Sequence, residues 1–176
     1  YSSAGGAKIP VLIINSLLKI FCREVYRYAN CHVKKLGSHL SADLRSKASG
    51  DIEIFKDDIL FESYEIKLNV EINTHIVNRA KEKIYLHNPK RYFLLSSKIS
   101  EKERDLINKK LLLIRKEHGC QLIIDNPLHL IKRYLRIINK IDFFVKNFGE
   151  MIIKDTELKI EHKKEWEDIY NSINQN

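Results

Sequence analysis

The sequence predicts an α/β domain in which a mixed central β-sheet is flanked by helices and followed by a helical C-terminal extension. Apolar and polar residues alternate with the period of two typical of half-buried strands between Asp51 and Val70. Segments with the helical period lie before and after this region, and short apolar runs separate the later ones. With 176 residues, 44% of them hydrophobic, the chain can bury one sizeable core, so we expect a single domain over residues 1–176. Because the chain begins at Tyr1 and not at methionine, a fragment of a longer protein is one interpretation.

The first half is predicted to contain one helix and two strands. Pro10 suits the first turn of a helix, and the apolar period continues the helix over about residues 10–29. The polar stretch 34–50 is predicted to be irregular. Two strands follow, joined by a turn near Asp57 and Asp58. If that turn is centred on Asp58, antiparallel pairing places Asp51 directly opposite Glu65.

The second half is predicted to alternate helices and strands, as a sheet flanked by helices requires. The expected order is a helix over 74–86, a buried strand over 91–97, a helix over 100–118, a strand over 121–125, an aromatic-rich helix over 128–148, and a charged amphipathic helix around Trp166. Tyr134, Phe143, Phe144 and Phe148 are expected in the core or at a dimer interface, and Trp166 is expected to attach the last helix to the core.

Composition and charge favour certain partners and disfavour others. Lysine and arginine number 31 against 23 acidic residues, a net charge of +8 that favours a polyanionic partner, nucleic acid first and an anionic membrane surface second. The three cysteines are far apart, which predicts no disulfide framework and suits a reducing cytoplasm. The longest apolar stretch, Val11 to Phe21, is too short and too polar to span a bilayer, so we expect no membrane partner.

Three residues of the predicted hairpin can carry chemistry together. Glu65 and Lys67 are two positions apart on one strand, so their side chains leave the same face, separated by roughly 6 to 7 Å. Two carboxylates facing each other, Asp51 and Glu65, repel unless a cation lies between them, and such hard oxygen ligands suit Mg²⁺. The Lys67 ammonium can orient a water and stabilise charge on a phosphate. The alternative interpretation is an ordinary solvated face of an amphipathic hairpin.

The sequence resembles the PD-(D/E)xK nucleases, and within them restriction endonucleases of the SacI type. The resemblance rests on three segments, YSSAGGAKIPVLI, SHLSADLRSKASGDIEIF and FESYEIKLNV, and on the later segments RYFLLSS, HGCQLIIDNPLHLIKRYLRII and EHKKEW. The sequence departs from the family motif at two places. Gly50 stands where the family has proline before the aspartate, and NVEIN, residues 69–73, stands where the family has a Gly-x-Pro run.

The resemblance implies a restriction-endonuclease-like core and Mg²⁺-dependent cleavage of both strands of a short, specific double-stranded DNA target. It also implies 5′-phosphate and 3′-hydroxyl ends, a homodimer and a bacterial cytoplasmic location. Carried over to this chain, Asp51, Glu65 and Lys67 are the catalytic residues. Asp51 and Glu65 would bind the metal, and Lys67 would be the base that positions the water.

Further residues are candidates beside these three. Glu24 on the first helix, or Glu53 on the first strand, could add a metal ligand, although a solvated residue is favoured for Glu24 and a surface salt bridge is at least as good an interpretation for Glu53. Candidate DNA contacts are Ser41, Asp43, Arg45, Ser46, Lys47, Arg79 and Lys83, with a solvated loop or helix face as the alternative.

Two other functions remain open from the sequence. A repair or junction-resolving nuclease would keep the fold and the chemistry but select DNA shape over sequence. A basic nucleic-acid-binding protein would keep the charge and use a hairpin with no catalytic role.

Overall fold

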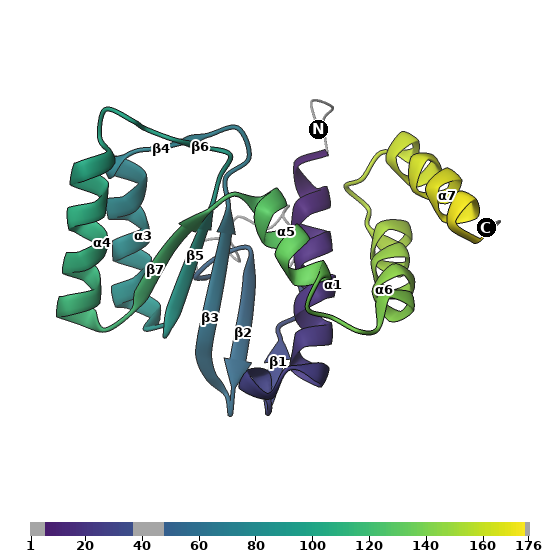
Figure 1. Ribbon diagram of the computed structural model, residues 1–176, viewed down its shortest axis with the longest axis horizontal. Helices are drawn as coiled ribbons and strands as arrows, with labels where there is room; N and C mark the ends of the chain where they lie inside the picture. Colours follow the sequence, from purple (N-terminus) through teal and green to yellow (C-terminus); the bar gives the residue numbers. More distant parts are fainter. Residues whose placement is uncertain (1–5, 37–47, 175–176) are drawn as a thin grey trace.

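The structure is a computed structural model that describes residues 6–36 and 48–174. A five-stranded sheet in the order β1-β2-β3-β5-β7 forms its centre, and helices cover both faces (Figure 1). β1, β2 and β3 are antiparallel to one another, whereas β3, β5 and β7 are parallel. The predicted mixed sheet flanked by helices is therefore confirmed.

The N-terminal segment is more divided than the sequence predicts. A 3-10 turn, Gly6–Lys8, leads into α1, Ile9–Glu24, which ends earlier than expected because Val25 is extended. A second 3-10 turn, Tyr26–Tyr28, and the left-handed residue Asn30 then reverse the chain into β1, Cys31–Val33. β1 pairs with β2 at the edge of the sheet and was missed from the sequence.

The hairpin forms with the predicted register. β2, Ile52–Lys56, and β3, Ile59–Ile66, are joined at Asp57 and Asp58, whose φ angles of 48° and 62° suit the tight turn of a hairpin. Ile52 pairs with Tyr64, as a turn centred on Asp58 requires, and an irregularity after Ile54 shifts the last pairs by one residue. β3 ends at Ile66, earlier than predicted, and Asn69 turns the chain with a φ of 60°.

The parallel half of the sheet matches the predicted alternation. α3, Thr74–His87, connects β3 to β5, Arg91–Leu95, and α4, Arg104–His118, connects β5 to β7, Gln121–Asp125. Two short strands, β4 (Glu71–Ile72) and β6 (Lys98–Ile99), form a small separate sheet near the carboxyl ends of β3 and β5. α3 begins beyond β4 and α4 beyond β6, so α4 starts four residues later than expected.

The two faces of the sheet have separate cores. α3 and α4 cover one face, where Val77, Ile84 and Ile107 pack against Tyr92 and Leu94. α1 and α5, Pro127–Leu135, cover the other face and bury Ile52, Ile54, Tyr64, Phe93 and Leu95.

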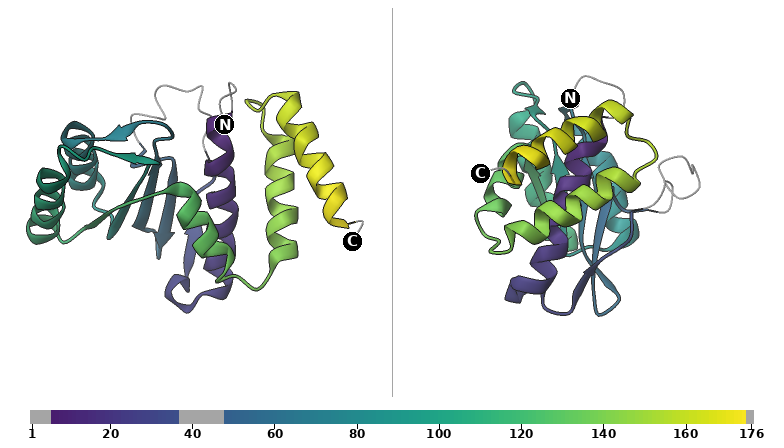
Figure 2. Two further views of the ribbon diagram at one scale, coloured as in Figure 1. Left: turned by 45° about the horizontal axis from the view of Figure 1, so that its top comes forward. Right: turned by 90° about the vertical axis from the view of Figure 1, so that its right-hand side faces the viewer.

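The predicted helix over 128–148 is two helices. α5 ends at Leu135 and α6, Ile141–Lys154, begins after a break that contains neither glycine nor proline. α6 packs against α1, and α7, Ile160–Asn174, packs against α6 on the side away from the sheet (Figures 1 and 2). The extension is helical as predicted, and no helix in the described ranges is long and apolar enough to cross a bilayer.

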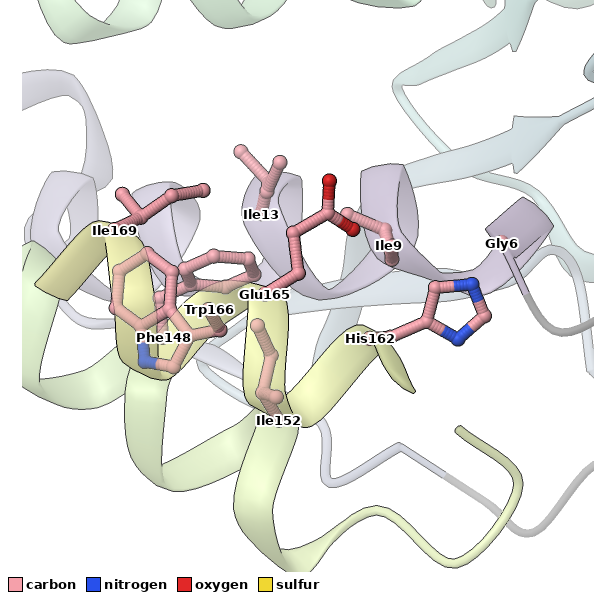
Figure 3. Close-up of a pocket in the computed structure, with 9 residues that line it drawn as sticks. All are labelled: Gly6, Ile9, Ile13, Phe148, Ile152, His162, Glu165, Trp166 and Ile169. Atoms are coloured by element: carbon pink, nitrogen blue, oxygen red, sulfur yellow. The ribbon is translucent and has the colours of Figure 1, made fainter. Parts of the chain in front are cut away.

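Trp166 attaches α7 as predicted. Its indole meets the Phe148 ring edge-on at a centroid distance of 4.8 Å (Figure 3). Gly149 makes room for it, since a Cβ there would lie 2.9 Å from the indole Nε1. A mainly apolar pocket of about 380 Å³ lies beside Trp166, between α1, α6 and α7. Phe148 is buried and Phe143 and Phe144 are half-buried, which confirms their core role.

Candidate active site

The predicted catalytic residues lie at one edge of the sheet. β3, β5 and β7 are parallel, so their carboxyl ends, at Ile66, Leu95 and Asp125, meet at this edge. β2 runs in the opposite direction, and Asp51 immediately precedes its first residue. In open α/β sheets this carboxyl edge is where ligands usually bind.

Two hydrogen bonds hold Asp51 beside Glu65. The Asp51 N–H donates to the Tyr64 carbonyl at 2.7 Å, and the Ile66 N–H donates to the Asp51 Oδ2 atom at 2.7 Å. Tyr64 and Ile66 are the two neighbours of Glu65 in the chain, so Asp51 lies next to Glu65 at the end of the hairpin. The strand pairing itself begins one residue later, with Ile52 and Tyr64, in the register that the turn position predicts.

Hydrogen-bond donors surround the Glu65 carboxylate, and only 8% of the residue's surface is exposed. The Lys67 ammonium is 2.7 Å from its Oε1 atom, and the Lys83 ammonium of α3 is 3.2 Å from its Oε2 atom. The Tyr92 hydroxyl of β5 donates a short bond to Oε2. Burial opposes ionisation of Glu65, but the bonds from Lys67 and Tyr92 and the positive charges nearby outweigh it and lower its pKa. Glu65 is therefore held as a carboxylate.

The negative charges of Asp51 and Glu65 both act on Tyr92. Burial is the largest cause that raises the pKa of this phenol, and the charges of Glu65 and Asp51 raise it further. The Glu65 carboxylate contacts this hydroxyl directly, and Asp51 lies near enough for its charge to act on it.

The donor set fits a divalent cation that also binds phosphate. Two carboxylates supply hard oxygen ligands, and Mg²⁺ is commonly bound by one or two carboxylates together with waters and substrate phosphates. No group of three or more His, Cys, Asp or Glu side chains that could hold a metal occurs in residues 6–36 and 48–174. The site thus provides part of a coordination shell and leaves the remainder to water and substrate.

Glu53 lies on the same face and forms a support for the segment before Asp51. The Ser49 N–H and hydroxyl both donate to its Oε1 atom at 2.8 Å, and the Lys34 ammonium is 2.6 Å from its Oε2 atom. Burial opposes its ionisation, but these bonds prevail and lower the pKa of Glu53. Glu53 thus forms the expected salt bridge, but a buried one, since only 6% of its surface is exposed.

At Gly50, where the motif of the nucleases that the sequence resembles has proline, the structure leaves no room for a side chain. A Cβ at this position would lie 2.6 Å from the Ser63 Oγ atom and 2.6 Å from the Tyr64 carbonyl oxygen. The chain passes so close to β3 at this point that only glycine avoids the contact. Packing against β3 thus requires glycine at this position, directly before Asp51.

Glu24 does not lie in this cluster. It is the last residue of α1, near the end of the sheet that carries the β2–β3 turn, whereas Asp51 and Glu65 lie at the other end (Figure 1). Its Oε2 atom accepts a bond from the Asn139 N–H at 2.9 Å, in the break between α5 and α6. The structure therefore gives Glu24 a role in holding that break.

The candidate DNA contacts divide into two groups. Ser41, Asp43, Arg45, Ser46 and Lys47 lie outside the described residues. Arg79 and Lys83 are one turn apart on α3, with Arg79 exposed and Lys83 reaching Glu65. Of these two residues, Lys83 therefore lies beside the Glu65 carboxylate.

The sequence interpretation missed Tyr92 and Ser49. Tyr92 belongs to a run of apolar residues, RYFLLSS, that predicts a buried strand and gives no sign of a polar contact. Its hydroxyl reaches Glu65 only because β5 pairs with β3 so that Tyr92 lies beside Ser63. The signal that could have identified it is a phenol inside a strand next to an acidic strand, since a buried tyrosine hydroxyl needs a partner.

Comparison of the sequence with models of known protein families and with curated proteins gives no match. The resemblance of individual segments to the SacI-type enzymes therefore stays an expectation.

Proposed function

We propose that this chain is a Mg²⁺-dependent endodeoxyribonuclease of the type II restriction kind, which hydrolyses phosphodiester bonds in double-stranded DNA at a short specific sequence. One observation carries the proposal. Asp51 is hydrogen-bonded to the residues on either side of Glu65, and the Lys67 ammonium lies 2.7 Å from the Glu65 carboxylate. The PD-(D/E)xK nuclease resemblance supports the same assignment.

The three residues would divide the work of hydrolysis. Asp51 and Glu65 would hold the ion, which supplies an acidified water and neutralises charge on the phosphate when it is bound. The reaction joins the oxygen of a water to phosphorus and breaks the bond from phosphorus to O3′, which leaves as a hydroxyl after taking up a proton. Lys67 is placed to donate a hydrogen bond to the attacking water or to a phosphate oxygen, and thereby to orient the one or stabilise the other.

The charges around the carboxylates suit an anionic substrate. Lys67 and Lys83 both contact Glu65, and their side chains are about one-third exposed, so they can reach outward as well. Arg79 extends the positive surface along α3, and the chain carries a net charge of +8. A phosphodiester backbone is the substrate that this arrangement favours. Because each chain has one such site, cleavage of both strands leads us to propose a homodimer.

The test is digestion of a long plasmid by the purified protein with Mg²⁺, beside the Asp51→Asn variant and a sample with chelator. We expect discrete bands from the wild type alone. A smear would point to a nuclease without sequence preference, and faster cleavage of branched than of linear DNA would favour the junction-resolving alternative. DNA binding without cleavage in Mg²⁺ or Mn²⁺ would reject the enzyme and leave a nucleic-acid-binding protein.

A further inference from the structure

Tyr92 lies on β5, and its hydroxyl reaches both Glu65 of the neighbouring strand β3 and the segment that leads into Asp51. Its side chain is fully buried on β5, on the face covered by α3 and α4. Its hydroxyl contacts both the Glu65 Oε2 atom and the Ser49 carbonyl oxygen, the latter at 2.8 Å. The hydroxyl has a single proton, which it shares between these two acceptors in a three-centre bond, with the charged carboxylate as the stronger acceptor.

The Ser49 end of this bridge is itself firmly held. The Ser49 N–H and hydroxyl donate to Glu53, and the Ser49 hydroxyl is also 2.8 Å from the Ser63 hydroxyl of β3. Ser49 is two residues before Asp51, and Gly50 between them is pressed against β3. The position of the Ser49 carbonyl therefore determines how the chain enters Asp51.

A buried phenol needs one hydrogen-bond partner to avoid a desolvation cost, and the Ser49 carbonyl alone would supply it. The contact with Glu65 is therefore not needed to satisfy the buried hydroxyl. It joins the segment that leads into one proposed metal ligand to the carboxylate of the other.

We propose that Tyr92 is a positioning residue of the active site, whose hydroxyl fixes Glu65 relative to the Ser49–Asp51 segment so that the two carboxylates can share one divalent ion. The inference rests on the proposed function, because it assigns Tyr92 to the metal site of that reaction. Partners that orient metal ligands in this way typically contribute ten- to hundred-fold to metal affinity or activity.

The test measures metal binding without DNA and without turnover. Free Mn²⁺ is followed by electron paramagnetic resonance as it is titrated into the metal-free wild type and into Tyr92→Phe, which removes only the hydroxyl. We expect Mn²⁺ to bind Tyr92→Phe about ten- to hundred-fold more weakly. In cleavage assays the Mg²⁺ concentration for half-maximal rate should rise in the same direction, while KM for DNA should stay unchanged because Tyr92 is buried.

The control is Tyr64→Phe. Tyr64 is equally buried, but on the opposite face of the sheet, where its hydroxyl donates to Glu62 at 2.6 Å. This variant also loses one buried hydroxyl bonded to a glutamate and should lose comparable stability. Its Mn²⁺ affinity should match that of the wild type. Equal Mn²⁺ affinity in Tyr92→Phe and Tyr64→Phe would reduce Tyr92 to a structural residue.

Two further outcomes are separated by the same titration. If the wild type binds Mn²⁺ no better than Asp51→Asn, the metal site and the proposed function both fail, whereas a deficit confined to Asp51→Asn rejects Tyr92 alone. If Tyr92→Phe does not fold by circular dichroism, Ser49→Ala decides: it keeps the carbonyl that Tyr92 contacts but removes the hydroxyl contacts with Glu53 and Ser63 that hold this carbonyl in place. A wild-type Mn²⁺ affinity in Ser49→Ala would then overturn the inference.

Discussion

Lys67 and Lys83 contact different oxygens of Glu65, and we expect the two lysines to have different roles in the proposed reaction. Lys67 directly follows the last residue of β3, and its N–H donates to the Leu95 carbonyl of β5 at 2.7 Å, so the sheet determines its position. Lys83 comes from α3 and reaches Glu65 across the face of the sheet. We therefore expect Lys67 to act on the reacting phosphate and Lys83 to act on the neighbouring DNA backbone.

Lys67→Ala should lower the rate of DNA cleavage by about 100-fold or more, because it removes a donor that acts where charge develops in the transition state. DNA affinity, measured in Ca²⁺ by a gel-shift titration, should change little. A variant that cuts at the wild-type rate would place the active site elsewhere in the chain.

Lys83→Ala should weaken DNA binding on target and scrambled duplexes alike and reduce the salt dependence of binding by about one ion, as loss of one phosphate contact does. Lys81→Ala is the matched control, since Lys81 lies on the same helix but pairs with Glu117 of α4 at 3.2 Å. Binding isotherms over a salt series measure both. Equal behaviour of the two variants would mean that α3 does not follow the DNA.

Glu53 makes the stability of the protein depend on pH. Its pKa in the folded state lies below the ordinary value of 4.5, so the unfolded chain takes up its proton first as the pH falls. The contribution of Glu53 is therefore complete well above pH 4.5 and is lost as the pH falls through the lower, folded pKa. Urea denaturation of Glu53→Gln should give a free energy of unfolding about 1–2 kcal/mol lower than wild type at pH 7, with a difference that shrinks on acidification. A constant difference between pH 3 and pH 7 would contradict this.

At the scale of elements, the hairpin explains why the proximity of Asp51, Glu65 and Lys67 could be predicted. Its register depends only on where the turn lies, and Asp57 and Asp58 identify the turn in the sequence. That register brings Asp51 next to Glu65, and Lys67 follows two residues after Glu65. This arrangement follows from local information alone.

Other elements could not be predicted because long-range contacts determine them. β1 has three residues and exists only as an edge strand against β2. The break at residues 136–140 contains no helix-breaking residue and is held by Glu24, which is more than a hundred residues away in the chain. The contact of Tyr92 with Glu65 likewise depends on the parallel pairing of β3 with β5.

Gly50→Ala should impair both stability and cleavage, because its Cβ would collide with β3 and displace Asp51. Gly119→Ala is the control, since Gly119 has a φ of 82° but open space around it. We expect the first variant to lose about 1–3 kcal/mol of unfolding free energy together with most of its activity. The second should lose about 1–2 kcal/mol and keep its activity. Full activity in Gly50→Ala would mean that the approach to β3 is not needed to place Asp51.

At the scale of the whole molecule, the two cores and the C-terminal pair of helices differ in how firmly they are held. The sheet is packed on both faces, with Tyr64 and Tyr92 fully buried. α7 packs mainly against α6, and Ile160, Ile169 and Ile173 along it are exposed.

Hydrogen exchange should reflect this difference. Backbone amides of β2, β3 and β5 are expected to exchange only through global unfolding, and those of α7 through a local opening of lower free energy. Mass spectrometry of peptides after timed exchange measures both. Protection of α7 equal to that of β3 would mean that the helix unfolds together with the sheet.

Trp166 is the only tryptophan in the chain, and it lies at the contact between α6 and α7. Its fluorescence is therefore a local optical probe: emission should shift to the red when α7 leaves Phe148, even while the sheet remains intact. Eight tyrosines are spread over the chain, and Tyr28, Tyr64, Tyr92 and Tyr134 are buried near the sheet. Their near-ultraviolet circular dichroism should report the sheet's packing. The chain thus contains two spectroscopic signals, one for its last helix and one for the part that holds the carboxylates.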